Sequence, residues 1–207
     1  MRTYGILGAL GGALTAVSGV VVQGVVQPAS DVPADQWSYP WPAAAHGPVS
    51  VVYAVFHVLV FAGLLGFARS GVAGAGRAAR AGGVLALTGT AVLFAAELLS
   101  IPFAGQRVDD TGPSAVGAVF AAGTLLSAIG LIVAGVATVR AGRWSGWRRY
   151  VALATGVWLA AMMVLIMTPA LAIAVGVYGA LLTALGVALA GHPSPAEART
   201  GRRAVQV

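Results

Sequence analysis

The chain has 207 residues, of which 58% are apolar and only 9% charged, and its mean hydropathy is +0.88. A soluble domain carries about a quarter charged residues, and a disordered chain needs low hydrophobicity with high net charge, so both classes are excluded. The net charge is +6, but the basic residues lie in short connections between apolar stretches, so we expect a membrane protein without a nucleic-acid partner. The absence of cysteine excludes disulfides, thiolate metal sites and cysteine nucleophiles.

Apolar stretches without charge predict an all-α, polytopic bundle of six transmembrane helices, since a bilayer core needs about 20 apolar residues of helix. The predicted spans are about 4–26, 49–68, 81–105, 115–139, 150–168 and 171–190. They form one transmembrane domain, 1–192, followed by a flexible cytoplasmic tail, 193–207. Thr168-Pro169 divides the last long apolar stretch into spans five and six. An alternative for the first span is a cleaved secretory signal, although its apolar region exceeds the usual length of about 7–15 residues.

The arginines indicate how the chain is oriented. Eleven of them fall in the amino terminus, in alternate connections and in the tail: Arg2, Arg69, Arg77, Arg80, Arg140, Arg143, Arg148, Arg149, Arg199, Arg202 and Arg203. Only Arg107 falls on the opposite side. By the positive-inside bias, both termini are predicted to be cytoplasmic.

Two connections carry aromatic residues. The predicted outer connection, 27–48, holds five prolines with Trp37, Trp41 and His46, and proline is expected to keep it from becoming helical. It is either an anchor at the headgroup level or a lid over a site that opens to the outside. The predicted inner connection, 140–150, combines arginine with tryptophan, which fits an anchor on anionic lipid.

A weak internal repeat relates residues 67–102 to residues 138–169. In each, an arginine-bearing inner loop is followed by a span that meets proline near its outer end. The pattern favours two parallel hairpins, spans two–three and four–five, related by an axis along the membrane normal, although shared composition would produce the same pattern.

Two ionisable residues lie deep in the predicted spans, His57 and Glu97. Such groups are costly in a membrane and by default mark function. Each lies about eight residues, or about 12 Å, inside the outer end of its helix, so the two side chains are at one depth on neighbouring helices and are able to meet. In a low dielectric the glutamate would be protonated or would share a proton with His57. The pair is either a hydrogen bond that holds two helices together, a proton-coupled or ligand-binding site, or a catalytic acid.

Other polar residues fall on the matching faces or in the same layer. The candidate binding residues are Tyr53, His57, Thr90, Glu97, Ser100, Trp158 and Tyr178, and Glu97 and His57 are the candidates for a catalytic step. One deep histidine without a second axial partner argues against haem, and acidic residues in a loop are usually solvated, so we expect neither a cofactor nor a metal.

Five segments resemble small multi-span membrane proteins of high-GC actinobacteria. They are DQWSYPW (35–41), YAVFH (53–57), AELLSIP (96–102), VDDTG (108–112) and RAGRWSGWRR (140–149). The resemblance covers most of the chain and implies a bacterial cytoplasmic membrane but no activity. A much looser likeness is to small membrane-embedded terpene cyclases, which are compact helical bundles that use buried acids to protonate isoprenoids. The present chain differs from them in span count and has one deep acid where they use two.

The sequence thus predicts that the protein binds or moves a small solute, a proton or a lipid-like molecule at a buried site formed by His57 and Glu97. One alternative is an enzyme acting on an isoprenoid or lipid, with Glu97 as proton donor. Another is a structural or accessory subunit that binds a partner through glycine-lined faces, and a small bundle of this kind is compatible with a homo-oligomer.

Overall fold

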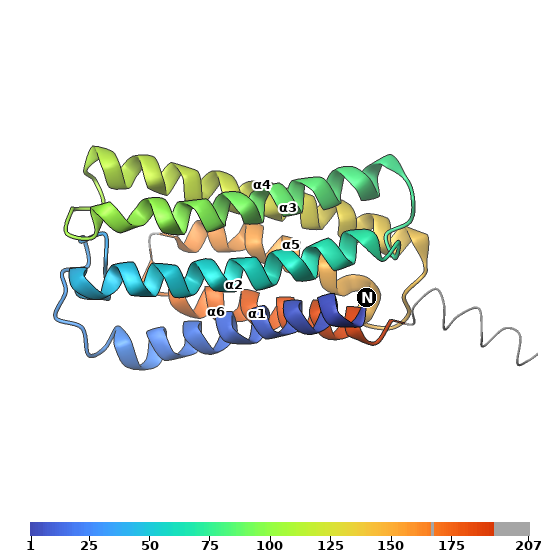
Figure 1. Ribbon diagram of the computed structural model, residues 1–207, viewed down its shortest axis with the longest axis horizontal. Coiled ribbons are helices and arrows are strands. Elements are labelled where there is room, and N and C mark those ends of the chain that lie inside the picture. The colour runs from blue at the N-terminus through green and yellow to red at the C-terminus, as the bar shows by residue number, and fades with distance from the viewer. Residues whose placement is uncertain (167, 193–207) are drawn as a thin grey trace, which may run out of the picture.

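The computed structural model describes residues 1–166 and 168–192. This part of the chain contains six long helices (Figure 1): α1 Arg2–Val21, α2 Ala43–Arg69, α3 Arg77–Ser100, α4 Thr111–Ala141, α5 Arg148–Met162 and α6 Leu171–Ala190. Three are extended by short turns, the π-helical η1 (Val22–Val26) and the 3₁₀ turns η2 (Ile101–Phe103) and η3 (Met163–Leu165). All six are long and apolar enough to cross a membrane, which confirms the predicted fold class. The predicted tail, 193–207, lies outside the described residues.

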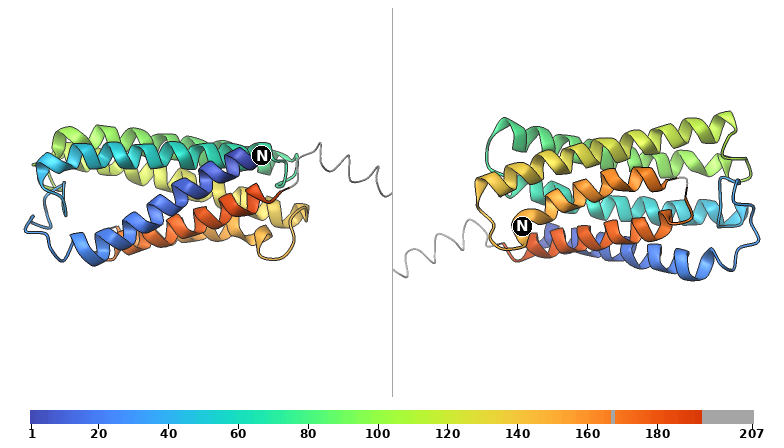
Figure 2. Two further views of the ribbon diagram at one scale, coloured as in Figure 1. Left: turned by 60° about the horizontal axis from the view of Figure 1, so that its bottom comes forward. Right: turned by 180° about the vertical axis from the view of Figure 1, so that it is seen from behind.

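The helices form a closed ring in sequence order. Each packs against its neighbours along the chain, and α6 runs beside α1 (Figures 1 and 2). The α1–α6 and α3–α4 interfaces are the most extensive, and the α5–α6 interface is the smallest around the ring. Side chains therefore point either to lipid, to a neighbouring helix or into the interior of the ring.

The two ends of the bundle differ in charge. One end, which we call the arginine end, holds the amino terminus and the end of α6, with Arg2, Arg69, Arg77, Arg80, Arg140, Arg143, Arg148 and Arg149. Within the described residues this end has no acidic side chain. The other, the cap end, holds the connections 27–42 and 104–110 with Arg107 and four aspartates. The arrangement agrees with the predicted alternation of the arginines.

One boundary prediction was wrong. Residues 43–48 were expected in a non-helical connection, but α2 begins at Ala43 and includes Pro48. A proline this close to a helix start removes only one hydrogen bond of the helix, and Pro42 immediately precedes the first helical residue. The predicted break at Thr168-Pro169 is confirmed, because α5 and η3 end by Leu165 and α6 starts at Leu171.

Glycines at seven-residue spacing hold the two largest interfaces together. Gly5, Gly12 and Gly19 of α1 lie against the backbone of α6, and Gly82 and Gly89 of α3 lie against the backbone of α4. Small residues allow such close approach in membranes. In contrast, Gly8 contacts Gly63 of α2, so the GxxxG pair formed by Gly8 and Gly12 is divided between two neighbouring helices.

The hydrophobic core runs from the arginine end along the bundle to Ala174 and Tyr178 of α6. It includes Leu64 and Phe67 of α2, Leu131 of α4, Leu159 of α5 and Leu185 of α6. The Trp144 indole also lies there and donates to His192 Nδ1 at 3.2 Å. Burial, with a smaller contribution from Arg148, lowers the pKa of His192, which keeps its imidazole neutral and able to accept this bond.

The interior towards the cap end is built differently, because α5 is short. At 1.5 Å per residue, α4 is about 46 Å long and α5 about 22 Å long. The turn between α5 and α6 accordingly stops short of the cap end in Figures 1 and 2. Trp37 occupies part of this region: its indole lies beside Gly117 and Phe120 on the interior face of α4.

The connections at the cap end bind each other. Trp37 N donates to the carbonyl of Gln106 and Val108 N to that of Asp35, both at 2.8 Å. Arg107 adds an ion pair with Asp35 at 2.6 Å. Residues 27–42 and 104–110 therefore form one unit, which we call the cap, and which positions Trp37 over the interior.

Candidate functional site

Glu97 lies on the interior face of α3. Leu93 and Thr90, four and seven residues earlier on the same face, are 6% and 1% exposed, whereas Leu98 and Leu99 face lipid at 40% and 52%. Within the described residues, the Glu97 carboxylate makes no hydrogen bond or ion pair. A carboxyl group in this position therefore has capacity to bind a proton, a cation or a hydrogen-bond donor.

The α2–α3 register places Glu97 opposite Tyr53, not His57. Ser50 Oγ lies 3.3 Å from Ser100 Oγ, and Gly83 lies against Ala68 at the other end of the interface. Counting three residues inward from Ser50 and from Ser100 brings Tyr53 level with Glu97.

His57 lies one turn deeper on α2 than Tyr53, and the structure does not bring it together with Glu97. Its Nδ1 lies 2.9 Å from the carbonyl of Tyr53 on its own helix, and no hydrogen bond or ion pair within the described residues joins it to Glu97. The equal-depth prediction assumed that α2 starts near Val49 and α3 ends near Gly105. The Ser50–Ser100 contact sets a register that differs from this assumed alignment by four residues, or about one helical turn.

Tyr53 and Tyr178 share the level of Glu97. The Tyr53 hydroxyl lies 2.5 Å from Ser18 Oγ of α1. Gly19 of α1 packs against Gly176 of α6, which places Ser18 and Tyr178 within about one turn of each other. We call Ser18, Tyr53, Glu97 and Tyr178 the polar layer; it brings together residues of four helices.

Tyr178 is the second group of the polar layer without a partner. It is only 8% exposed and packs in the core cluster, yet its hydroxyl forms no hydrogen bond within the described residues. Buried phenols usually find a partner, because burying an unpaired hydroxyl group is costly. Glu97 and Tyr178 therefore both have unused hydrogen-bonding capacity at one level of the bundle.

The remaining predicted residues have structural partners. Thr90 Oγ1 donates to the carbonyl of Ala86 at 2.9 Å, and Trp158 Nε1 donates to that of Ala174 at 2.9 Å. Ser100 Oγ donates to the carbonyl of Glu97 at 2.6 Å and also contacts His46 Nε2 at 3.2 Å. The side-chain donor of each of these three residues is therefore occupied by a backbone carbonyl, which indicates a structural role.

Sequence reasoning missed Trp37 as a neighbour of the polar layer and missed the contact of His46 and Ser50 with Ser100. In the α3–α4 register, Gly89 lies against Gly123 and Ser127, so Glu97 is level with Gly117, where Trp37 packs. Trp37 Nε1 is buried without a partner. The spacing of His46, Ser50 and Tyr53 along one helical face was an available signal, but it required α2 to begin at Ala43.

Neither of the two described cavities borders the polar layer, and the described residues form no cluster of metal ligands. A groove at the arginine end and a small cavity between α1, α2 and α6 are lined by neither Glu97 nor His57. In the part of the chain that the structure describes, no group of three or more histidine or acidic residues could hold a metal ion.

Comparisons of this chain with protein-family models, curated proteins and solved structures found no match. The two resemblances noted from the sequence therefore remain predictions, and the function is argued from the site.

Proposed function

We propose that this membrane protein binds or translocates a small solute, a proton or a lipid-like molecule in the cap half of the bundle, with Glu97 as the group that recognises it. The observation that carries this proposal is the pair of interior groups without partners, Glu97 and Tyr178, at one level. An unpaired carboxyl and phenol in an apolar surrounding are each costly to bury, and a ligand that hydrogen-bonds to both would offset that cost.

The surroundings of the polar layer support binding from the cap end. Because α5 is short, less of the bundle is walled by helix towards the cap end, where Trp37 of the cap lies against Phe120 of α4. Exposed cap residues such as Asp31 make this end polar. We further propose that the cap is the lid considered from the sequence, and that the arginine end faces the cytoplasm of a bacterium.

The accessory-subunit alternative is less well supported. It predicts glycine-lined faces turned to lipid, whereas Gly12, Gly19, Gly82 and Gly89 pack inside the bundle. Neither of the two described cavities borders Glu97, so they do not distinguish the enzyme alternative from a binding role.

Native mass spectrometry of the protein extracted gently from its own membrane tests the proposal. We expect a discrete small molecule to co-purify with the wild-type protein and to be absent from Glu97→Gln. This substitution keeps the shape of the side chain but removes the acid. Asp31→Asn, the same change at an exposed cap residue, is the matched control and should retain the molecule.

Proteoliposomes loaded with a pH-sensitive dye test the proton case. Proton uptake driven by an imposed potential should occur with wild type and Asp31→Asn and be lost in Glu97→Gln. The proposal is wrong, and the polar layer is structural, if wild type, Asp31→Asn and Glu97→Gln all purify without a bound small molecule, conduct no protons and unfold at the same temperature.

A further inference from the structure

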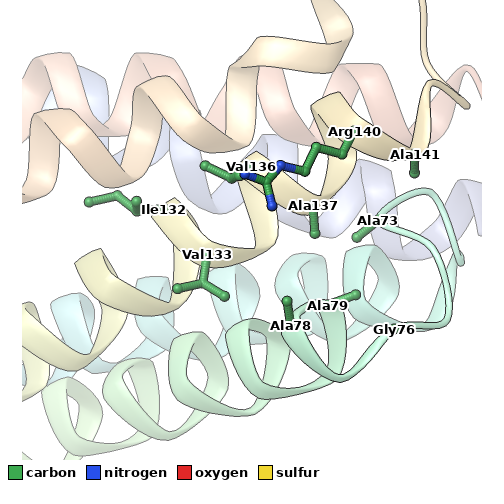
Figure 3. A pocket seen from close by; sticks show the side chains of 10 residues that line it. All are labelled: Ala73, Gly76, Ala78, Ala79, Ile132, Val133, Val136, Ala137, Arg140 and Ala141. Carbon is green, nitrogen blue, oxygen red and sulfur yellow. The ribbon is translucent and has the colours of Figure 1, made fainter.

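A groove of about 550 Å³ runs between α3 and α4 at the arginine end, outside the site described above. Its walls are apolar: Ala78 and Ala79 come from α3, and Ile132, Val133, Val136 and Ala137 come from α4 (Figure 3). Small side chains on α3 face larger aliphatic ones on α4, which leaves the space between the helices partly unfilled. The groove belongs to the outer surface of the ring, because Arg140 and Ala78 on its rim are exposed.

One end of the groove is basic. Arg140 is the single charged residue in its lining, and its side chain runs along α4 towards Val136 (Figure 3). In the described part of the chain, the Arg140 guanidinium has no hydrogen-bonding or ion-pair partner. The arginine end as a whole carries no described acid that would compete for it.

The first turn of α3 adds backbone donors on the facing side of the groove. Gly76 precedes the helix and also lines the groove, and no side chain caps the helix there. The first N–H groups of a helix have no partner within the helix. They favour an anion, as the positive end of the helix dipole does.

We propose that this groove binds one anionic phospholipid, with the phosphate at Arg140 and an acyl chain along the apolar walls. The groove is suited to such a ligand because it joins a cation at the predicted headgroup level to an apolar channel that runs into the membrane. From Arg140 to Ile132 the α4 wall is about 12 Å long, which accommodates the first part of an acyl chain. Charge complementarity favours an anionic lipid over a zwitterionic one.

The test is a titration of the delipidated full-length protein in detergent with phosphatidylglycerol or phosphatidylcholine, followed by native mass spectrometry. We expect one tightly bound phosphatidylglycerol and a weaker response to phosphatidylcholine. Arg140→Gln should weaken phosphatidylglycerol binding about five-fold, the usual effect of one basic residue near a membrane surface. Glycerol phosphate, which has the headgroup chemistry without acyl chains, should not displace the lipid.

Matched variants separate the groove from general surface charge. Arg149→Gln removes an equal charge at the same end outside the groove and should leave binding within two-fold of wild type. Val133→Phe fills the groove and should weaken binding of both lipids, whereas Val84→Phe, on the lipid-facing side of α3 at 61% exposure, should not.

The proposal is overturned if Arg149→Gln weakens binding as much as Arg140→Gln, or if the two lipids bind equally well. It is also overturned if glycerol phosphate competes with the lipid, since the site would then recognise free phosphate. Thermal unfolding of each variant ensures that a loss of binding is not a loss of fold. Because Glu97 takes no part, Glu97→Gln should bind phosphatidylglycerol as wild type does, so this proposal and the proposed function fail independently.

Discussion

An ionisable side chain inside a membrane helix costs about 2.5–3.5 kcal/mol on insertion scales, and Glu97 lies partly buried in α3 without a hydrogen-bond or ion-pair partner in the described residues. Threonines in the same bundle show the opposite behaviour. Thr15, Thr90, Thr138 and Thr155 each donate to the carbonyl four residues earlier, so their own helix satisfies them. Residue type alone therefore predicted the unusual chemistry of Glu97, whereas it gave no information on Thr90.

Close helix contacts at single glycines lead to a stability prediction. A Cβ at position 12 would lie 2.4 Å from the Thr183 backbone nitrogen, whereas a Cβ at position 24 would meet nothing within 4 Å. Gly12→Ala should lower the free energy of unfolding by about 1–3 kcal/mol, because α1 and α6 must separate. Gly24→Ala should change it by less than about 0.5 kcal/mol. Unfolding in mixed detergent micelles, followed by circular dichroism, measures both; equal effects would contradict the close α1–α6 packing.

Among the elements, the α2–α3 hairpin shows what sequence reasoning can and cannot supply. The apolar stretches located both helices, but helix ends inferred from hydropathy were displaced by several residues. Helix ends do not fix the register of two antiparallel helices: the observed register differs from the predicted one by about one turn, so Glu97 is level with Tyr53 and not with His57. Contacts such as Ser50–Ser100 decide the register, and they become visible only when the helices are packed.

The cap lies at the end of the bundle that the short α5 does not reach. Proline and tryptophan in the connection 27–48 predicted either an anchor or a lid, and the structure shows residues 27–42 bound to residues 104–110 with Trp37 turned into the bundle. The indole packs against Gly117 and Phe120 of α4 near the cap end.

Trp37→Ala should therefore expose the polar layer. We expect a hydrophobic carbodiimide to modify Glu97 several-fold faster in this variant than in wild type, as measured by peptide mass spectrometry. Trp147→Ala, at the opposite end of the molecule and 54% exposed in wild type, is the control and should leave the rate unchanged. An unchanged rate in Trp37→Ala would show that the cap does not control access to Glu97.

For the whole molecule, charge is separated between the two ends of the ring. Eight described arginines lie at one end, and Arg107 with four aspartates lies at the other. By the positive-inside bias, the arginine end should face the cytoplasm. The chain has no cysteine, so single cysteines can be introduced without background.

Topology can be measured in this way. In intact bacterial cells with a permeable outer layer, a membrane-impermeant maleimide should label Asp31→Cys at the cap end. It should label Arg77→Cys at the arginine end only after the membrane is opened. The reverse pattern would invert the proposed orientation, and labelling of both in intact cells would contradict a six-span arrangement.

The sequence by itself determined the class of the protein, the number of spans, the end of the bundle at which each connection lies and the unusual position of Glu97. These follow from local properties, namely the length of apolar runs, the placement of charge and the cost of an acid in lipid. Only the tertiary structure decided that the ring closes and that Glu97 is level with Tyr53. It also decided that Tyr178 has no hydrogen-bond partner and that Trp37 lies against α4. These features depend on register, tilt and helix length across interfaces, where small differences in register change which side chains meet.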